Sequence, residues 1–182
     1  AGAVERPTEP GARLCGAGRL CCLADLSIDF RIGVTLEETL PASLADLPRL
    51  RTLDLESNWV AGTTPEAICA LRELETLGVR FNGMSGTIPS CLENCAKLTK
   101  IDYTYNSDPG LSGTIPRSLC ALRGLTKLML QYTTGLTGTI PDCFGVDQPD
   151  LEILSLEGNQ LTGPIPSSLC DASSLGYLLL YK

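Results

Sequence analysis

The chain has 182 residues, and its 14 Lys and Arg against 21 Asp and Glu give a net charge of −7 at pH 7. This acidic balance, with the basic residues scattered along the chain, argues against a nucleic-acid surface. The sequence has no His, which excludes Ser-His and Cys-His nucleophile pairs and metal sites that use His. No apolar stretch reaches the roughly 18 residues of a membrane helix. We therefore expect a non-enzymatic chain without a cofactor and without a transmembrane segment.

The first residues are expected to precede the main fold. Residues 1–14 are rich in Pro and Gly and indicate a flexible lead-in. Cys15, Cys21 and Cys22 follow, and they can staple a small cap over the exposed end of a repeat array. Which of these cysteines pair stays open. The chain is thus divided into a lead-in with a cap, residues 1–22, and a repeat domain, residues 23–182.

The repeat domain shows a fixed period. Prolines end corresponding segments at intervals of 24 to 27 residues, at Pro41, Pro65, Pro89, Pro116, Pro141 and Pro166. The pattern L-x-x-L-x-L-x-x-N is most complete in residues 151–166, LEILSLEGNQLTGPIP. A period of this size predicts a solenoid of about six repeats. The last repeat is incomplete, and we expect the chain to continue beyond Lys182.

Each repeat is expected to contribute a short strand whose two apolar residues, two positions apart, point inward. These pairs are Leu26/Ile28, Leu53/Leu55, Leu77/Val79, Ile101/Tyr103, Leu128/Leu130, Leu154/Leu156 and Leu178/Leu180. An Asn three positions later can donate to and accept from the backbone of a tight turn. It occurs at Asn58, Asn82, Asn106 and Asn159, whereas residues 131–135 (QYTTG) interrupt this series.

The second half of each repeat begins with a short extended segment and ends in a helical turn. Residues 111–116, 136–141 and 161–166 are nearly identical and follow the pattern L-[ST]-G-x-I-P. Gly permits the turn, the β-branched residues favour an extended piece, and Pro starts the helical turn. The apolar residue three positions after Pro is expected to point inward, at Ile68, Leu92, Leu119, Phe144 and Leu169.

These motifs resemble the plant-type extracellular leucine-rich repeat (LRR), over about residues 23–182. The resemblance implies an α/β-type repeat solenoid with a parallel β-sheet on its concave face, short helical turns and a second short sheet. Members of that family include receptor-kinase ectodomains, cell-wall-associated proteins, polygalacturonase inhibitors and an ice-binding protein. Most are secreted or face the cell exterior, and none implies catalysis by the repeats.

The cysteines of the repeats alternate between two positions relative to Pro. Cys69, Cys120 and Cys170 come four residues after it, and Cys91 and Cys143 come two residues after it. Because adjacent coils lie roughly 5 Å apart, coil-to-coil disulfides Cys69–Cys91 and Cys120–Cys143 are predicted. Cys170 would then pair beyond Lys182.

Two alternatives to this pairing remain open. In a shifted register, Cys91 pairs with Cys120 and Cys143 with Cys170; otherwise all of them are buried thiols. Cys95 takes the position of an inward leucine and is predicted to be a buried thiol.

The outward strand positions suggest a binding surface. Phe81, Tyr105 and Tyr132 fall at the same position of consecutive repeats and form an aromatic stripe, which can anchor an interface, stack on sugars or only stiffen the sheet. Polar residues are predicted to flank the stripe, at Arg80, Lys100, Asp102, Lys127, Gln131 and Glu157. This mixture suits a protein or glycan ligand.

Three further features bear on function. Residues 107–110 and 133–135 read as insertions beside the stripe, either binding loops or tolerated variation. The acidic cluster Asp142, Asp147, Asp150 and Glu152 is expected to be a solvated face and not a Ca²⁺ site. An ice-binding face needs regular threonine rows, and only three are evident, Thr87, Thr114 and Thr139, before Pro164 interrupts them.

The sequence thus favours a secreted recognition or adhesion module, at the cell surface or wall, that binds a protein or glycan through its concave face. The alternative is a structural component of an extracellular assembly, with contacts between copies of the chain. No nucleic-acid partner is expected.

Overall fold

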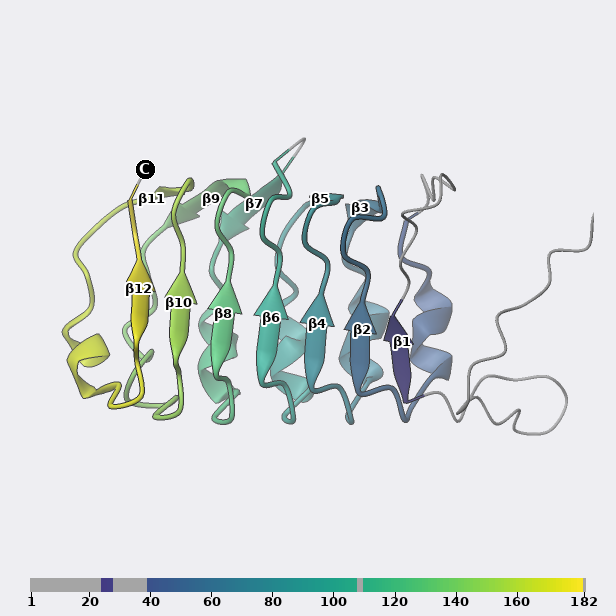
Figure 1. Cartoon of the computed structure of the whole chain (residues 1–182), viewed down its shortest axis with the longest axis horizontal. Coiled ribbons are helices and arrows are strands. Elements are labelled where there is room, and N and C mark those ends of the chain that lie inside the picture. The colour runs from purple at the N-terminus through teal and green to yellow at the C-terminus, as the bar shows by residue number, and fades with distance from the viewer. Residues whose placement is uncertain (1–23, 28–38, 108–109, 182) are drawn as a thin grey trace, which may run out of the picture.

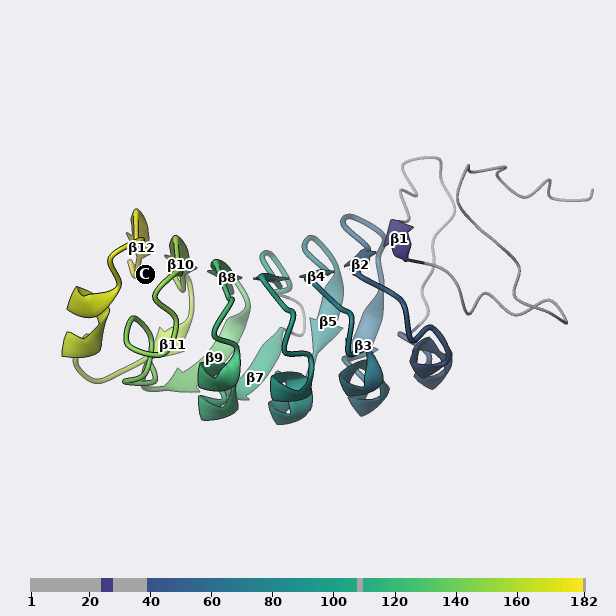
Figure 2. The same cartoon turned by 90° about the horizontal axis from the view of Figure 1, so that it is seen from below.

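The computed structural model describes residues 24–27, 39–107 and 110–181. The cap predicted within residues 1–22 lies outside this range. The described residues form a curved solenoid, in which each coil contributes one strand to a main parallel sheet on the inner side of the curve (Figures 1 and 2).

The main sheet has seven strands in the order β1-β2-β4-β6-β8-β10-β12, each paired in parallel with the next. Their bounds are Asp25–Ser27, Thr52–Asp54, Thr76–Gly78, Lys100–Asp102, Lys127–Met129, Ile153–Ser155 and Tyr177–Leu179. The first inward residue of each strand pairs in register with that of the next coil, so that Leu53, Leu77 and Ile101 are aligned. This register brings equivalent outward residues into columns across the sheet.

A second set of short strands follows the turns. The strands β3 (Ala61–Thr63) and β5 (Gly83–Ser85) pair with each other, and β7 (Leu111–Thr114), β9 (Thr134–Gly138) and β11 (Gln160–Leu161) form a three-stranded sheet. A bridge between Gly86 and Leu111 links the two sets. The expected short extended pieces are therefore present, as a nearly continuous second face.

Within the described residues, five 3-10 helices lie on the outer side of the curve, opposite the main sheet (Figure 2). They are η1 (Ala42–Asp46), η2 (Glu66–Ala70), η3 (Ser90–Asn94), η4 (Arg117–Ala121) and η5 (Ser167–Asp171). An extended Pro precedes each helix, and its carbonyl accepts the first i→i+3 bond, as in Leu119 N–H to Pro116 O at 3.1 Å. The coil that follows Pro141 has turns in place of a helix.

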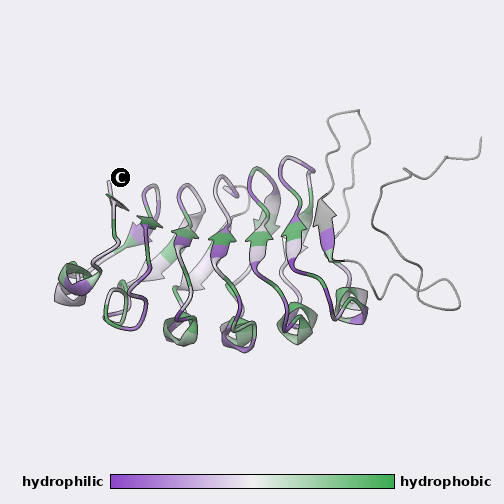
Figure 3. Ribbon diagram, turned by 60° about the horizontal axis from the view of Figure 1, so that its bottom comes forward, coloured by the Kyte–Doolittle hydropathy of each residue, from purple (hydrophilic) through white to green (hydrophobic). Residues whose placement is uncertain are grey.

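The core is one apolar strip between the main sheet and the 3-10 helices. The inward strand residues Leu53, Leu77 and Ile101 are fully buried, as are the helix residues Ile68 and Leu92. Hydrophobic segments recur at the same places in successive coils (Figure 3). Each coil thus buries its apolar residues against its neighbours, as the repeat pattern predicts.

The asparagines act as predicted at the turns. Asn82 Oδ1 accepts from Val60 N–H at 2.8 Å, and its Nδ2 lies 2.7 Å from Leu55 O and 3.0 Å from Val79 O. The side chain thereby joins its own coil to the preceding one. Asn106 makes equivalent bonds, accepting from Met84 N–H and donating to Tyr103 O.

The interruption at residues 131–135 corrects one prediction. Thr133 is buried and occupies the asparagine position, where its hydroxyl donates to Asn159 Oδ1 at 2.7 Å. Thr134 and Gly135 belong to β9, which pairs with β7 through four residues. The extra residues therefore lengthen a strand and do not form an inserted loop. For the first predicted insertion, only Ser107 and Gly110 are among the described residues.

Disulfides join neighbouring coils on the outer side, in the predicted register. Cys69 and Cys91 are bonded with a Cα–Cα distance of 5.7 Å, and Cys120 and Cys143 with one of 5.8 Å. Among the described cysteines, Cys95 is a buried thiol and Cys170 an exposed one. Burial raises the pKa of the Cys95 thiol.

Candidate functional site: the concave sheet and its aromatic edge

The charged residues at the centre of the concave sheet come from neighbouring coils. Lys100 and Lys127 are Cα partners on β6 and β8, so two ammonium groups stand on adjacent strands. Lys100 Nζ lies 3.6 Å from Asp102 Oδ2, and Lys127 Nζ lies 4.0 Å from Oε2 of Glu152, the residue directly before β10. Both lysines keep part of their side chain exposed. The centre of the sheet therefore presents two neighbouring cations to solvent.

Arg80 lies two residues beyond the end of β4 and is more firmly held. Its guanidinium donates to Glu56 Oε2 at 2.6 Å, and this hydrogen bond raises the pKa of Arg80. The Arg80 Cζ atom also lies 5.9 Å from the centroid of the Phe81 ring, within the range of a cation–π contact. Arg80 thus links the charged centre of the sheet to its aromatic edge.

Two residues predicted in an exposed polar rim are buried. Asp102 is 1% exposed and Glu157 is 4% exposed. Ser155 Oγ donates to Glu157 Oε2 at 2.8 Å, and Thr104 N–H donates to Asp102 Oδ1 at 3.1 Å. Outward residues on a curved sheet are covered by side chains of the adjacent coils, so an outward position does not ensure exposure.

Three polar atoms in this region make no hydrogen bond with the described residues. They are Asp102 Oδ2, Thr104 Oγ1 and Gln131 Oε1. Buried polar atoms without partners are few in native proteins, and each costs about 1–3 kcal/mol. Thr104 and Gln131 thus offer unused hydrogen-bonding capacity just beyond β6 and β8, whereas Asp102 Oδ2 is ion-paired with Lys100.

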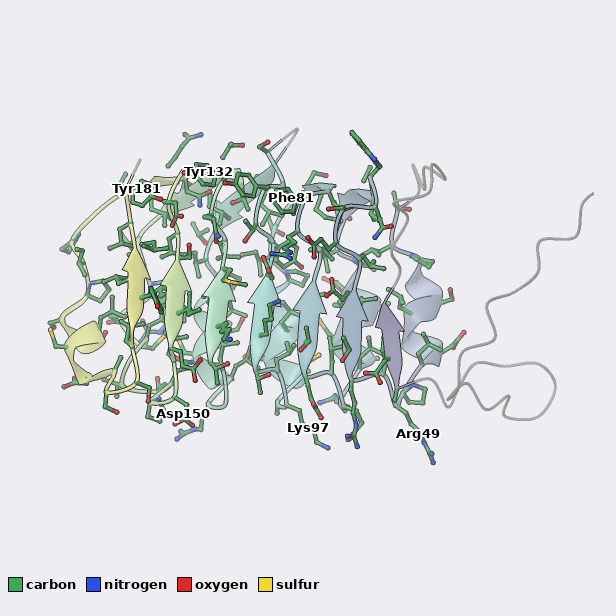
Figure 4. All side chains as sticks on the ribbon, in the orientation of Figure 1. Arg49, Phe81, Lys97, Tyr132, Asp150 and Tyr181 are labelled. Carbon is green, nitrogen blue, oxygen red and sulfur yellow. A yellow bond between two sulfur atoms is a disulfide. The ribbon has the colours of Figure 1, made fainter. Side chains whose placement is uncertain are left out.

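The predicted aromatic stripe is a stacked ladder, which we call the aromatic ladder: Phe81, Tyr105 and Tyr132. The ring centroids of Phe81 and Tyr105 are 4.7 Å apart with an interplanar angle of 10°, and those of Tyr105 and Tyr132 are 4.8 Å apart at 7°. Phe81 and Tyr132 lie beyond the C-terminal ends of the strands, while Lys97 and Arg49 lie near the N-terminal ends (Figure 4).

The ladder requires an unusual backbone. Phe81, Tyr105 and Tyr132 have φ values of 55°, 55° and 54°, in the left-handed region that bulky residues rarely adopt. Each N–H donates to a carbonyl of the next coil, as in Phe81 N–H to Thr104 O at 2.9 Å. Hydrogen bonding between coils thus fixes the strained conformation and stacks the rings. Part of the stripe is therefore cross-strand packing, one of the interpretations that the sequence left open.

A groove at the start of the ladder was missed by the sequence reasoning. It has a volume of about 470 Å³, and its lining residues are Ser57, Trp59, Phe81, Asn82, Gly83, Tyr105 and Ser107. Trp59 is the only tryptophan of the chain and is 72% exposed. In the sequence, this tryptophan directly follows a turn asparagine, which departs from the repeat pattern. That departure was the signal from which the groove could have been found.

The second face carries a longer threonine row than the sequence suggested. A methyl group built on Gly62, Gly86, Gly113, Gly138 or Gly163 would lie within 2.7–3.1 Å of the Cγ2 of a threonine in the preceding coil. These exposed threonines form one row of five: Thr39, Thr63, Thr87, Thr114 and Thr139. The expectation that only three threonines align is therefore wrong, because Thr39 and Thr63 lie outside the Gly-Thr-Ile-Pro motif.

The acidic residues near the fifth coil do not converge. Asp142 pairs with Arg117, Glu152 with Lys127, and Asp150 is exposed. Within residues 24–27, 39–107 and 110–181, no three His, Cys, Asp or Glu side chains are placed to share a metal ion. None of the helices in the same ranges has the length and apolarity needed to cross a bilayer.

Comparison with known proteins agrees with this architecture. Residues 49–71 and 150–172 match the family model for the Leucine Rich Repeat. Receptor-like protein 32 of Arabidopsis thaliana is 33% identical over 131 residues, which are 71% of this chain and 15% of that protein. The chain therefore spans a small part of this relative.

Three solved plant structures are similar. The LRR ectodomain of the receptor kinase GASSHO1/SCHENGEN3 from Arabidopsis thaliana, in complex with CASPARIAN STRIP INTEGRITY FACTOR 2, has 40% identity and a TM-score of 0.75, covering 81% of this chain and 17% of that one. The plant peptide hormone receptor RGFR1, in complex with RGF2, has 33% identity and a TM-score of 0.72. The match covers 79% of this chain and 22% of that one.

A plant ice-binding protein has 33% identity and a TM-score of 0.65, covering 75% of this chain and 42% of that one. The repeat pattern, the parallel inner sheet, the second face and these similarities agree. The chain is a leucine-rich-repeat protein of the plant extracellular type.

Proposed function

We propose that the chain is an extracellular, non-enzymatic recognition module that binds a protein or peptide across the centre of its concave sheet. The observation that carries this proposal is the placement of Lys100 and Lys127 on adjacent strands. Like charges on directly neighbouring strands destabilise a sheet. Asp102 and Glu152 offset part of this repulsion, and an acidic group of a ligand would offset more of it.

The surroundings of the lysines support a binding role. Thr104 and Gln131, four positions after the lysines on the same coils, keep polar atoms without a hydrogen bond among the described residues, and Arg80 and the aromatic ladder lie at the same end of the strands. Glu157, which is buried, would position its neighbours and not contact a ligand directly. Similar plant ectodomains have been solved with RGF2 and with CASPARIAN STRIP INTEGRITY FACTOR 2.

The test is lysine-directed cross-linking on native source material, followed by affinity measurement with the captured partner. Replacing Lys100 and Lys127 together by Glu is expected to weaken binding at least about tenfold, a change of about 1.4 kcal/mol. Lys97→Glu is the matched control, because Lys97 lies outside the sheet, in the turn before β6, and pairs with Glu73 at 2.6 Å (Figure 4).

The same experiment separates the alternative. Cross-links mainly between copies of the chain, or to a repeating matrix protein, would indicate a structural component of an extracellular assembly. Binding that is equally sensitive to Lys97→Glu would also contradict the proposed site.

The threonine row supports a second candidate function, the binding of ice. Thr63, Thr87 and Thr114 are exposed and aligned by the adjacent glycines, and one similar structure is a plant ice-binding protein. Thermal hysteresis that is lost in Thr114→Tyr and retained in Thr99→Tyr would establish this function. Absence of thermal hysteresis in the unaltered chain would dismiss it.

A further inference from the structure

The aromatic ladder is closed at one end and open at the other. At the closed end, a Cβ on Gly158 would lie 2.5 Å from Tyr132 Cδ1, so the Tyr132 ring rests on the Gly158 backbone. At the other end, Ser57 occupies the position that precedes Phe81 in the ladder and has the same left-handed backbone, with φ 61°. Its side chain is too small to cover the Phe81 ring, which is 46% exposed.

Trp59 supplies a second aromatic surface beside this open end. It lines the same groove of about 470 Å³ as Ser57, Phe81 and Tyr105. Trp59 holds a left-handed backbone with φ 58°, which is strained for a bulky residue. No hydrogen bond of its indole N–H is present among the described residues, and its ring is 72% exposed. A large apolar side chain is thus held in solvent next to an uncovered ring.

The part of the groove that the structure describes is electrically neutral. Among its described lining residues, the Tyr105 phenol is the one ionisable group. The Arg80 Cζ atom lies 5.9 Å from the Phe81 centroid, and its guanidinium is already paired with Glu56 at 2.6 Å. The amide of Asn82 is engaged by the backbone. The remaining polar groups are the hydroxyls of Ser57, Ser107 and Tyr105, together with the Trp59 N–H.

We infer that this groove binds a neutral pyranose ring of a glycan. One face of a pyranose carries C–H groups, which pack against the electron-rich face of an aromatic ring. Its edge carries hydroxyl groups, which suit the Ser57 and Ser107 hydroxyls and the Trp59 N–H. The ring centroids of the aromatic ladder are 4.7 and 4.8 Å apart. A sugar ring at the Ser57 position would continue this stack. The neutral lining and neutral sugar also match in charge, whereas a charged side chain would find no counter-charge among the described lining residues.

The single tryptophan provides the readout. Intrinsic emission of Trp59 is titrated with cellohexaose, mannohexaose and a xyloglucan heptasaccharide, which together offer neutral pyranoses of different linkage. A saturable change with at least one of them is expected, with a Kd on the order of 1 mM, as for a small open site. No saturable change with any of the three would overturn the inference.

Two substitutions of one residue form the matched pair. Ser57→Tyr adds a further ring to the aromatic ladder. The left-handed backbone at this position tolerates a tyrosine, because Phe81, Tyr105 and Tyr132 have nearly the same φ. This variant is expected to lose binding at least about tenfold, while Ser57→Ala keeps it within about threefold. Unchanged thermal unfolding of both variants shows that the fold is retained. Equal binding by the two variants would contradict the site.

One further titration tests whether the groove binds an aromatic side chain of a peptide instead of a glycan. N-acetyltyrosinamide is the probe for an aromatic side chain of a peptide; if it changes Trp59 emission at lower concentration than all three glycans, the glycan assignment is wrong. This test is independent of the proposed protein ligand, because Ser57→Tyr leaves Lys100 and Lys127 unaltered. Partner capture that persists in Ser57→Tyr would show that the two surfaces are separate.

Discussion

The hydroxyl of Tyr103 lies 2.8 Å from Thr64 Oγ1 inside the apolar core, although 39 positions separate the two residues. Tyr103 takes an inward strand position held elsewhere by an aliphatic residue such as Leu130. Thr64 takes the position held by Ile88, Ile115 and Ile140 in later repeats. Two departures from the repeat pattern therefore satisfy each other, as a buried polar group requires.

This pair predicts a loss of stability at alkaline pH. Burial raises the pKa of Tyr103 to about 12, from its usual value of 10.0. Above the lower value the unfolded chain loses a proton that the folded chain retains, so stability falls as pH rises through this window. The full contribution is present below pH 10, and about 1.4 kcal/mol is lost for each pH unit above it.

Urea unfolding between about pH 9 and pH 11.5 checks this prediction. Tyr103→Phe should show a smaller decline with pH than the unaltered chain. At neutral pH it should cost about 1–3 kcal/mol, because the Thr64 hydroxyl loses its partner. Replacing Thr64 by Val in the same variant should recover part of this cost. Cys170→Ser in every protein removes the exposed thiol that could exchange with the disulfides of the folded chain. An identical decline in both proteins would contradict the assignment.

Asn82→Asp is expected to destabilise the solenoid by about 3 kcal/mol. The Asn82 amide donates toward Leu55 O, Val79 O and Arg80 O. A carboxylate cannot donate and would face these carbonyl oxygens. Asn94→Asp is the control, since Asn94 is exposed at the end of η3, and it should change stability by less than about 0.5 kcal/mol. Chemical denaturation of both variants gives the comparison.

The features that follow from regular spacing could be predicted from the sequence. The register of the strands, the asparagine turns and the partners Cys69 and Cys91 all depend on a fixed distance from one coil to the next. The features that depend on side chains of other coils could not. Asp102 is covered by its neighbours, and the left-handed backbone of Phe81 is fixed by a bond to the next coil. The open end of the aromatic ladder, in turn, depends on how far each ring covers the next.

The disulfides predict a specific pattern of thiol reactivity. In the folded chain iodoacetamide should modify Cys170, which is exposed, and spare Cys95, which is buried and has a raised pKa. Non-reducing peptide mapping should join Cys69 to Cys91, and a Cys91–Cys120 peptide would show the shifted register instead. Replacing Cys69 and Cys91 by Ala should lower stability by about 3 kcal/mol, the value for a loop of this length.

Two glycines with different surroundings give the last prediction. A Cβ on Gly135 would lie 2.1 Å from Leu111 O, where β9 passes close to the backbone of β7. The obstacle is backbone and cannot rotate away, so Gly135→Ala must separate the two strands and should cost more than about 2 kcal/mol. A Cβ on Gly124 would meet no atom within 4 Å. Gly124→Ala should therefore leave stability unchanged or raise it by about 0.5 kcal/mol, by restricting the unfolded chain. Thermal unfolding of the two variants should show opposite or clearly unequal shifts, and equal shifts would mean that β7 and β9 do not approach this closely.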